Sequence, residues 1–481
     1  MQNKIRKMIA VIFPIMLLIS LLTGCGIVSE PIESTQGKID IIQEKVETSI
    51  DGEELWVLTV NSGMKRIIEK VAERFEEEHS DVTIKITHGP ENGEETDVWL
   101  EQLRTQIMAG EGPDLFLLPA ENISSASPIQ DANQFMRAGL CLDITDYYNN
   151  DEELSKSAFS SAVMDAGVVD GTRYVLPLRF NFPVIYAHVQ QLEAHHLTVD
   201  DLQKGMSSLA DLTQTLEPGA IGSDYGDWFF NLYWMNSLSQ LINYEDQAVV
   251  LKKAELVEYL ADYRTLTTWG FSISSGSPTL SSYVGHDSFW TKDGQYIFLG
   301  TLGNLAQNLR IAKAEGIDLA TIPMRASDGS LIANISYYGA IGANTKHPDV
   351  AYEFLRQLLL EETQWMPNLE DMLEFGWPVL LEGSGPALDA AILDASRGNN
   401  TSDDARKRNM AIHDAQMSEE DFAILYTQPT AVRFLPAAQF DYMVEIGNKL
   451  NIQSNPDAMS VDVEALADEI LQELNWEVAE G

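Results

Sequence analysis

Few residues of this chain combine the types and the spacing that catalysis or metal binding needs. His195 and His196 are adjacent, so their side chains face apart on a helix or a strand and form a poor metal pair. The acidic cluster between Asp143 and Glu153 lacks the spacing and the glycine of a calcium-binding loop. Gly-x-Ser-x-Gly, His-Glu-x-x-His and glycine-rich phosphate loops are absent from the sequence, and nothing singles out one carboxylate pair among its 73 acids. We therefore expect no catalytic residues, no metal and no cofactor.

Cys25 is the residue whose position best indicates a chemical modification. Three cations between Lys4 and Lys7 precede an apolar run from Met8 to Leu22, which has about 15 residues where a bilayer span needs about 20. This pattern is typical of an export signal. The segment Leu22-Thr23-Gly24-Cys25 resembles the bacterial lipobox, which implies acylation of the Cys25 thiol and removal of residues 1–24. The two chains of a diacylglycerol group suffice for lasting attachment, so we expect the protein to be lipid-anchored on the extracytoplasmic face of the cell membrane.

Cys141 is the second of only two cysteines, so a disulfide framework is excluded. It lies in the apolar segment Gly139–Asp143, which predicts a small buried hydrophobic residue and not a reactive thiol.

Composition and charge restrict the remaining classes. A chain of 481 residues with 45% apolar residues can bury sizeable cores, and its length predicts roughly two or three domains. Its net charge of −42 becomes about −45 without residues 1–24, because that segment holds three cations and no acid. A surface this acidic is repelled by phosphate backbones, so we expect no binding of nucleic acid.

Patterns of hydrophobic residues predict how the chain is organised. Residues 25–51 are polar with little periodicity and are predicted to form a flexible tether. Apolar runs at 55–60, 82–86 and 115–118 predict strands, and helical spacing at 64–75 and 98–108 predicts helices between them. Alternating strands and helices predict a parallel α/β sheet.

Later segments give weaker signals of the same kinds. Residues 171–177 are interpreted as a turn into a strand that ends at Pro177, and residues 351–359 and 463–474 have helical spacing.

Four segments, in this order, resemble the family 1 extracellular solute-binding proteins, which include maltose- and multiple-sugar-binding proteins of ABC importers. The most specific is Leu103–Phe116, which contains Ala109-Gly110-Glu111-Gly112-Pro113-Asp114. The other three are Asp170–Pro177, Lys292–Gly300 and Ile341–Leu360, although Val175 stands where the family usually has glycine. The resemblance extends from about Leu55 to the C-terminus.

The resemblance implies an α/β, two-lobed periplasmic-binding-protein-like fold (type II) whose lobes are joined by crossover hinge strands. Lobe one would comprise residues 52–160 and 298–345, and lobe two residues 161–297 and 346–481. Both lobes would contact the solute in the closed state only, so that binding shifts the population toward closure. The implied partners are a small-molecule solute, with a saccharide as the first expectation, and the permease subunits of an ABC importer; we expect a monomer that is not an enzyme.

A sugar offers apolar C–H faces and a polar hydroxyl rim, so its site needs aromatic rings and hydrogen-bonding side chains. Candidates lie at the strand ends and lobe crossings where the family places its cleft. They are Asn61, Ser62, Arg179, Asn181, Trp228, Trp290, Thr301, Asn304, Tyr337, Tyr338 and Trp377.

Several of these residues also have a purely structural interpretation. Asn61 and Ser62 suit a helix cap, Arg179 suits a surface ion pair, and Trp228 lies in a stretch that resembles a core helix. Trp377 lies between Gly376 and Pro378 in a loop-like stretch, which favours exposure in a cleft. We assign Asp114 to structure, as a capping or turn-forming residue.

The sequence does not identify the solute. Proteins of similar fold also bind peptides, polyols and phosphorylated alcohols, and fold alone does not decide function. A secreted glycan-degrading enzyme and a sensor subunit that reports to a membrane kinase are the alternatives from other classes.

Overall fold

The computed structural model describes residues 53–60, 64–89, 93–120, 128–129, 131–223, 235–269, 272–273, 296–364, 376–381, 415, 421, 423–424, 427–435, 437–451 and 455–480. Residues 52–481 form one compact unit, in which the described residues form a seven-stranded sheet, a five-stranded sheet and two short two-stranded pairs. The predicted signal segment, the predicted tether and Cys25 lie outside the described residues.

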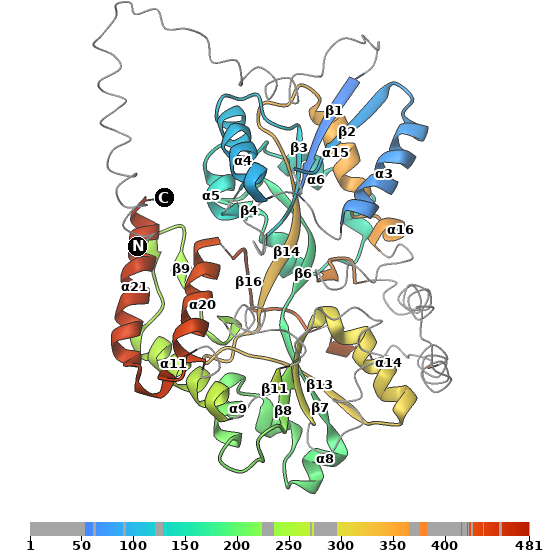
Figure 1. Ribbon diagram of the computed structural model, residues 1–481. Coiled ribbons are helices and arrows are strands. Elements are labelled where there is room, and N and C mark those ends of the chain that lie inside the picture. The colour runs from blue at the N-terminus through green and yellow to red at the C-terminus, as the bar shows by residue number, and fades with distance from the viewer. Residues whose placement is uncertain are drawn as a thin grey trace, which may run out of the picture. The chain divides into compact units, whose positions relative to one another are not determined.

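The apolar runs of the first third of the chain pair side by side in the larger sheet (Figure 1). Among the described residues this sheet has seven strands in the order β15-β6-β14-β3-β1-β2, with β16 also paired to β14. Its strands are β1 (Glu53–Thr59), β2 (Val82–Thr87), β3 (Leu115–Pro119), β6 (Val175–Asn181), β14 (Ile332–Ile341), β15 (Trp377–Pro378) and β16 (Ala431–Arg433). Strand β1 pairs in parallel with both β2 and β3, so the predicted parallel α/β arrangement is confirmed.

Strand β6 differs from its prediction, because it does not end at Pro177 but continues to Asn181. Proline cannot donate to a sheet ladder and is tolerated where the pairing is irregular. The β6–β14 register shifts next to Pro177, between Tyr337 and Tyr338, which explains how the strand passes through this residue.

A smaller sheet of five strands occupies the other part of the described chain, in the order β11-β8-β12-β7-β13. Its strands are β7 (Pro183–His188), β8 (Ile221–Ser223), β11 (Ser272–Ile273), β12 (Ile297–Thr301) and β13 (Leu319–Pro323). Short antiparallel pairs lie apart from both sheets: β4 (Val168–Val169) with β5 (Thr172–Arg173), and β9 (Ile242–Asn243) with β10 (Ala248–Val249).

One extended segment joins the two sheets. Strand β6 ends at Asn181 in the larger sheet, and β7 begins at Pro183 in the smaller one. Successive side chains of a strand point to opposite faces, and on β7 this alternation places Val184 and Tyr186 in one hydrophobic cluster and Ile185 and Ala187 in the other. The smaller sheet is therefore buried on both faces at this strand.

Helices cover both sheets, and several of them begin and end close to their predicted positions. Around the larger sheet they are α3 (Lys65–Glu78), α4 (Gly93–Met108), α5 (Ala132–Arg137), α6 (Thr145–Asn149), η1 (Leu154–Lys156), α7 (Ser161–Asp165), α15 (Pro348–Gln357) and α16 (Glu361–Gln364). The others are α8 (Val189–Ala194), η2 (Val199–Leu202), α9 (Met206–Leu212), η3 (Met235–Ser237), α11 (Lys253–Trp269), η4 (Leu302–Asn304), α14 (Leu305–Glu315), α20 (Ala437–Leu450), η6 (Ala458–Ser460) and α21 (Val463–Glu480).

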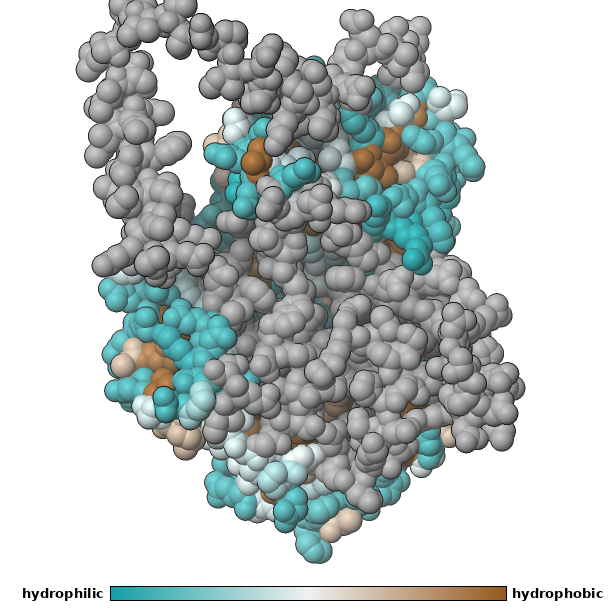
Figure 2. Space-filling view, in the orientation of Figure 1, coloured by the Kyte–Doolittle hydropathy of each residue, from teal (hydrophilic) through white to brown (hydrophobic). Residues whose placement is uncertain are grey.

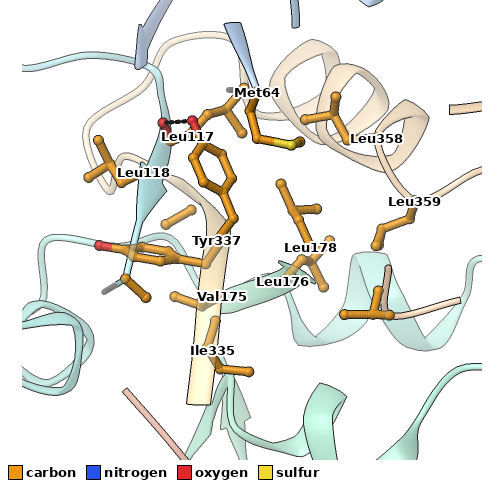
Figure 3. Packing of buried hydrophobic residues seen from close by; sticks show 14 of the residues in the cluster. Met64, Leu117, Leu118, Val175, Leu176, Leu178, Ile335, Tyr337, Leu358 and Leu359 are labelled. Atoms are coloured by element: carbon orange, nitrogen blue, oxygen red, sulfur yellow. Dashed lines mark hydrogen bonds between the residues drawn. The ribbon is translucent and has the colours of Figure 1, made fainter. Parts of the chain in front are cut away.

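All ten residues of β14, a strand in the middle of the larger sheet, are buried. Figure 3 shows Leu117 and Leu118 of β3, Leu176 of β6 and Leu358 beyond α15 around Tyr337. On the outside, polar residues cover most of the described surface in the view of Figure 2.

The two hydrophobic clusters divide the chain differently from the lobes proposed above. Met164 and Val175–Leu176 of the segment given to lobe two pack in the larger sheet's cluster. Helix α15 also packs against β14 and α3 of that sheet, although residues 346–481 were all given to lobe two. The physical reason is that β6 and α15 bury their apolar side chains against β14, so the chain changes lobe near Asn181 instead of near residue 160. We refer below to the larger sheet with its helices as lobe one, and to the smaller sheet with its helices as lobe two.

Candidate functional site

Asp114 belongs to the most specific motif of the sequence, and its carboxylate joins three segments of lobe one. One oxygen accepts a hydrogen bond from the Trp56 backbone N–H of β1 (2.8 Å), and the other accepts from the Thr345 hydroxyl beyond β14 (2.7 Å). The Asp114 carbonyl also accepts from the N–H of Gly342 (2.8 Å). The structural interpretation of Asp114 is confirmed, because all of these contacts hold strands together.

Gly342 explains part of the same junction. A Cβ atom at this position would lie 2.5 Å from the Pro113 carbonyl oxygen, which is too close for any other residue. The motif thus brings β3 and the end of β14 into close contact and serves the scaffold.

Four predicted site residues share neighbouring strands of the larger sheet. Tyr337 on β14 lies opposite Arg179 on β6, and Trp377 on β15 lies opposite Phe180. The side chains of Arg179, Tyr337 and Trp377 are 0% exposed, and that of Tyr338 is 1% exposed. The structure therefore differs from the expectation that Trp377 is exposed in a cleft, because pairing of β15 with β6 buries the ring inside the sheet's core.

Hydrogen bonds within lobe one hold these buried polar groups. The Tyr337 hydroxyl donates to the Leu117 carbonyl (2.8 Å, Figure 3) and lies 2.7 Å from the Thr59 hydroxyl. Tyr338 packs edge-on against the Phe434 ring, with centroids 5.5 Å apart. In this structure both tyrosines support the sheet from inside.

Arg179 is not in the surface ion pair that its sequence context allowed. Its guanidinium donates to the side-chain oxygen of Gln364 (3.1 Å) and to the Gln364 carbonyl (3.4 Å). Within the described part of the chain no carboxylate pairs with it, and its Nε has no hydrogen-bond partner. Burial lowers the pKa of the Arg179 guanidinium to about 9.

Asn181 and Thr301 are brought together where the chain passes between the sheets. The Asn181 side-chain oxygen accepts from the N–H of Phe182 (3.0 Å) and from that of Gly303 (3.4 Å). The Thr301 carbonyl accepts from the Tyr186 hydroxyl (2.7 Å), and Asn304 lies three residues beyond Thr301, at the end of η4. These contacts tie the crossing segment to β12 and η4.

The other predicted solute contacts, Asn61, Ser62, Trp228 and Trp290, lie outside the described residues.

A cavity of about 470 Å³ is lined by segments of both lobes. Its volume is within the range of ordinary small-molecule sites. The lining combines aromatic, amide, hydroxyl and charged side chains: Asn133, Ala166, Gln240, Leu241, Ile242, Tyr244, Asp328, Ser330, Ile332, Thr430, Ala431, Val432, Arg433 and Phe434. Asn133 lies in the first turn of α5 in lobe one, whereas Tyr244 follows β9 and lies in lobe two.

Arg433 is the cationic residue of this lining, and neutral amides position it. Its Nε donates to the Asn334 side-chain oxygen (3.2 Å), and its Nη2 donates to the Asn236 side-chain oxygen (2.8 Å). Asn236 in turn accepts from the Asn334 amide (3.1 Å) and donates to the Ile332 carbonyl (2.9 Å). Both asparagines are 0% exposed, so the amide pair forms a rigid support under the guanidinium.

Two features of Arg433 distinguish it from an ordinary surface arginine. Its Nη1 is shielded from water and has no hydrogen-bond partner, and no carboxylate in the described chain pairs with the guanidinium. Burial lowers its pKa to about 10, so the group keeps its charge at neutral pH.

Sequence reasoning missed Arg433, although a signal for it was present. The residue interrupts an otherwise apolar run in Ala431-Val432-Arg433-Phe434-Leu435, and a charge inside a run of strand length needs an explanation.

The remaining chemical residues of the described chain have structural roles, and the prediction that Cys141 is buried is confirmed. Cys141 is buried and its thiol lies 3.8 Å from the Phe135 carbonyl oxygen; burial raises its pKa well above the usual range. Asp151 of the acidic cluster binds the Arg356 guanidinium (2.9 Å) and anchors α15, which is a structural role. In the described chain no group of three His, Cys, Asp or Glu side chains is arranged to hold a metal ion.

Comparison with known proteins decides the family. The model of the bacterial extracellular solute-binding proteins matches residues 61–365, which is more than half of the 481 residues. This chain belongs to that family. No curated protein sequence matches it in the sequence comparison.

Solved structures of solute-binding proteins share the fold at low sequence identity. The sugar-binding protein MalE from Xanthomonas citri has a TM-score of 0.58 at 14% identity, covering 89% of this chain and 98% of that protein. The galacto-N-biose-/lacto-N-biose I-binding protein from Bifidobacterium longum has a TM-score of 0.56 at 12% identity, with 90% and 98% covered. The cyclic α-maltosyl-1,6-maltose binding protein from Arthrobacter globiformis has a TM-score of 0.52 at 16% identity, with 89% and 100% covered.

These likenesses establish the predicted fold class, a two-lobed solute-binding protein of type II. Of the helices in the described chain, none is long and apolar enough to cross a bilayer.

Proposed function

We propose that this solute-binding protein is the lipid-anchored receptor of an ABC importer, and that it captures a saccharide in the cavity between its lobes by hinge closure. The observation that carries the proposal is the cavity of about 470 Å³, because residues of both lobes line it in a chain of the solute-binding family. A solute that touches both lobes stabilises the state in which they are close.

The saccharide assignment has two supports. The three structures compared above are described as binding a sugar, lacto-N-biose or a cyclic maltosyl-maltose. The cavity itself offers Tyr244 and Phe434 for the apolar faces of a sugar ring, and Gln240, Ser330 and Thr430 for its hydroxyl groups. Asn61, Ser62, Trp228 and Trp290 remain proposed contacts of the same solute.

A thermal-shift screen over sugars, oligosaccharides, peptides and polyols tests the assignment. A ligand at 100 times its dissociation constant adds about 2.7 kcal/mol to the free energy of unfolding, which is readily measured. Shifts with peptides or polyols alone would leave the receptor class intact but exclude a saccharide. Conversion of a saccharide to product would instead identify a glycan-active enzyme.

The lipid anchor is tested separately at Cys25. The Cys25→Ser precursor should remain uncleaved and should not incorporate radioactive palmitate, because the acceptor thiol is gone. Cys141→Ser is the matched control and should be labelled like the unmodified protein. Incorporation into the Cys25→Ser protein would exclude this residue as the anchor.

Transport itself is the last part of the proposal. The purified protein should bind to membranes that contain its importer permeases, more tightly with solute than without it. Equal binding in both states would contradict a receptor that is read in its closed state.

A further inference from the structure

We propose that the solute of this protein carries a negatively charged group, either a carboxylate or a phosphate ester, and that Arg433 binds this group in the cavity. The inference rests on the proposed function, and it deepens that function by naming the charge class of the solute.

The first step is the electrostatic state of Arg433. A guanidinium that is largely removed from water normally has a carboxylate partner, because an unpaired buried charge is costly. Arg433 has only the neutral oxygens of Asn334 and Asn236, at 3.2 and 2.8 Å, and its Nη1 has no partner. The folded protein therefore maintains an uncompensated positive charge at this place.

The second step is the position of that charge. Arg433 lines the cavity together with Asn133, Tyr244 and Phe434, so the charge belongs to a site that is large enough for a ligand. Guanidinium groups bind carboxylate and phosphate oxygens in paired hydrogen bonds and are the side chains best suited to these anions. An anionic group on the solute would supply the counter-charge that the described side chains around Arg433 do not provide.

The third step concerns the acids near the cavity, which have other partners. Asp328 lines the cavity, but its carboxylate accepts from the Ser330 N–H (2.9 Å) and from the Ser330 hydroxyl (2.5 Å). Asp131 caps helix α5 by accepting from the Asn133 N–H (2.7 Å), and it also accepts from the Tyr244 hydroxyl (3.4 Å). Neither carboxylate forms an ion pair with Arg433 within the described chain, so the guanidinium is left for the solute.

The buried asparagines explain why the charge stays in place. Asn236 and Asn334 bind each other at 3.1 Å as well as Arg433, and they fix two of the three guanidinium nitrogens without neutralising them. A carboxylate in their position would have neutralised the site. Asn236 and Asn334 are positioning residues that preserve a binding charge.

The experiment compares matched acidic and neutral saccharides on the full-length protein in detergent. The pairs are glucuronate with glucose, galacturonate with galactose, their disaccharides, and glucose 6-phosphate with glucose; inorganic phosphate and glycerol 3-phosphate represent anions without a sugar. Binding is followed by melting temperature and then by calorimetry. We expect the acidic member of a pair to bind at least about 10-fold more tightly, and this preference to weaken in 0.5 M salt.

Three variants assign the preference to Arg433. Arg433→Gln should lower affinity for the acidic saccharide about 10- to 100-fold and for its neutral partner less than about 3-fold, because only the charge-assisted hydrogen bonds are lost. Arg433→Lys should keep part of the preference. Arg325→Gln is the control, since Arg325 donates to the Gly329 carbonyl next to the cavity without lining it, and its affinities should not change.

Each outcome has a defined meaning. Preference of the unmodified protein for neutral saccharides, or unchanged acid binding by Arg433→Gln, overturns the inference and leaves saccharide capture standing. Binding of phosphate or glycerol 3-phosphate alone, lost in Arg433→Gln, supports the anionic group and removes the sugar from the proposed function. Absence of any shift in the screen overturns both. If Arg433→Gln does not fold, the paired ligands on the unmodified protein decide alone.

Discussion

Arg179 and Arg433 flank strand β14 from its two sides: Arg179 on β6 lies opposite Tyr337, and Arg433 on β16 lies opposite Asn334. Both guanidinium groups bind neutral oxygens, and in the described chain neither has a carboxylate partner. Arg179 is completely enclosed, whereas Arg433 is half-buried and lines a cavity.

The comparison shows that a missing counter-ion does not by itself identify a binding residue. Hydrogen bonds to Gln364 partly offset the cost of burying the Arg179 guanidinium, and the enclosed side chain has a structural role in lobe one. Arg433 also lacks a counter-ion, but it lines a cavity that a ligand can enter. Access, together with unmet charge, separates a scaffold arginine from a binding arginine.

The largest loss of stability should come from adding a side chain at Gly376, which packs against β6, the strand that carries Arg179. Gly376 has a φ of +114°, and a Cβ there would lie 2.3 Å from the Ser336 hydroxyl oxygen and 2.7 Å from the Phe180 carbonyl oxygen. Gly376→Ala should therefore lower the free energy of unfolding by more than about 3 kcal/mol, measured by denaturant titration.

Gly329 provides the control for this variant near the Arg433 cavity. Its φ is +84°, but nothing lies within 4 Å of a Cβ placed there, so Gly329→Ala should cost only about 1 kcal/mol. Equal losses in the two variants would contradict the claim that the Arg179 side is closely packed and the Arg433 side is open.

Removing the partner of Arg179 should affect stability alone. Gln364→Leu deprives the guanidinium of its 3.1 Å acceptor, and it also leaves the Leu358 carbonyl without the Gln364 amide at 2.6 Å. We expect a loss of about 2 to 3 kcal/mol in unfolding free energy, because these polar groups stay buried. Solute affinity measured by calorimetry should stay within about 3-fold, and a larger change would place Arg179 in the binding site.

Removing a partner of Arg433 should affect both properties. Asn236→Ala deletes the acceptor at 2.8 Å from Arg433 and the donor to the Ile332 carbonyl. The expected loss in unfolding free energy is about 2 kcal/mol, with about a 5- to 10-fold loss in affinity for the anionic solute, which the Gln364 variant does not share. Affinity equal to that of the unmodified protein would show that the asparagine pair does not orient the guanidinium.

Asp262 on α11 is an acidic side chain that is partly buried, and its substitution should have the smallest effect on stability of the variants considered. Burial, followed by the charges of Glu258 and Asp211, raises the pKa of its carboxyl to about 6. Between about pH 4 and pH 6 the folded protein keeps a proton that the unfolded chain has lost, so the contribution to stability is present below pH 4 and is lost as the pH rises through 6. Because the group is partly exposed, we expect a difference of only about 1 kcal/mol.

Asp262→Asn should therefore be more stable than the unmodified protein at pH 7 and equally stable at pH 4, as measured by melting temperature. A constant gap for Asp262→Asn would exclude its titration as the cause.

Elements that depend on local pattern were predictable from the sequence, and contacts between distant residues were not. The alternation of Val82–Thr87 and the helical spacing of Lys65–Glu78 are properties of short segments, and both elements form as expected. The burial of Trp377 depends on pairing with Phe180, almost 200 residues earlier in the chain, so its loop-like neighbours were misleading. Likewise, Arg433 meets Asn334 and Asn236 across separations of 99 and 197 residues, which no local pattern reveals.

The burial of Cys141 has a practical consequence for measuring how the lobes move. If Cys25 carries the proposed lipid, Cys141 is the remaining cysteine, and the raised pKa and enclosure of its thiol make it unreactive toward maleimide dyes. A pair of cysteines introduced at exposed positions, one in each lobe, can therefore be labelled in the native background. Energy transfer between the two dyes would then report opening and closing of the two lobes directly, because the thiol of Cys141 does not take up dye.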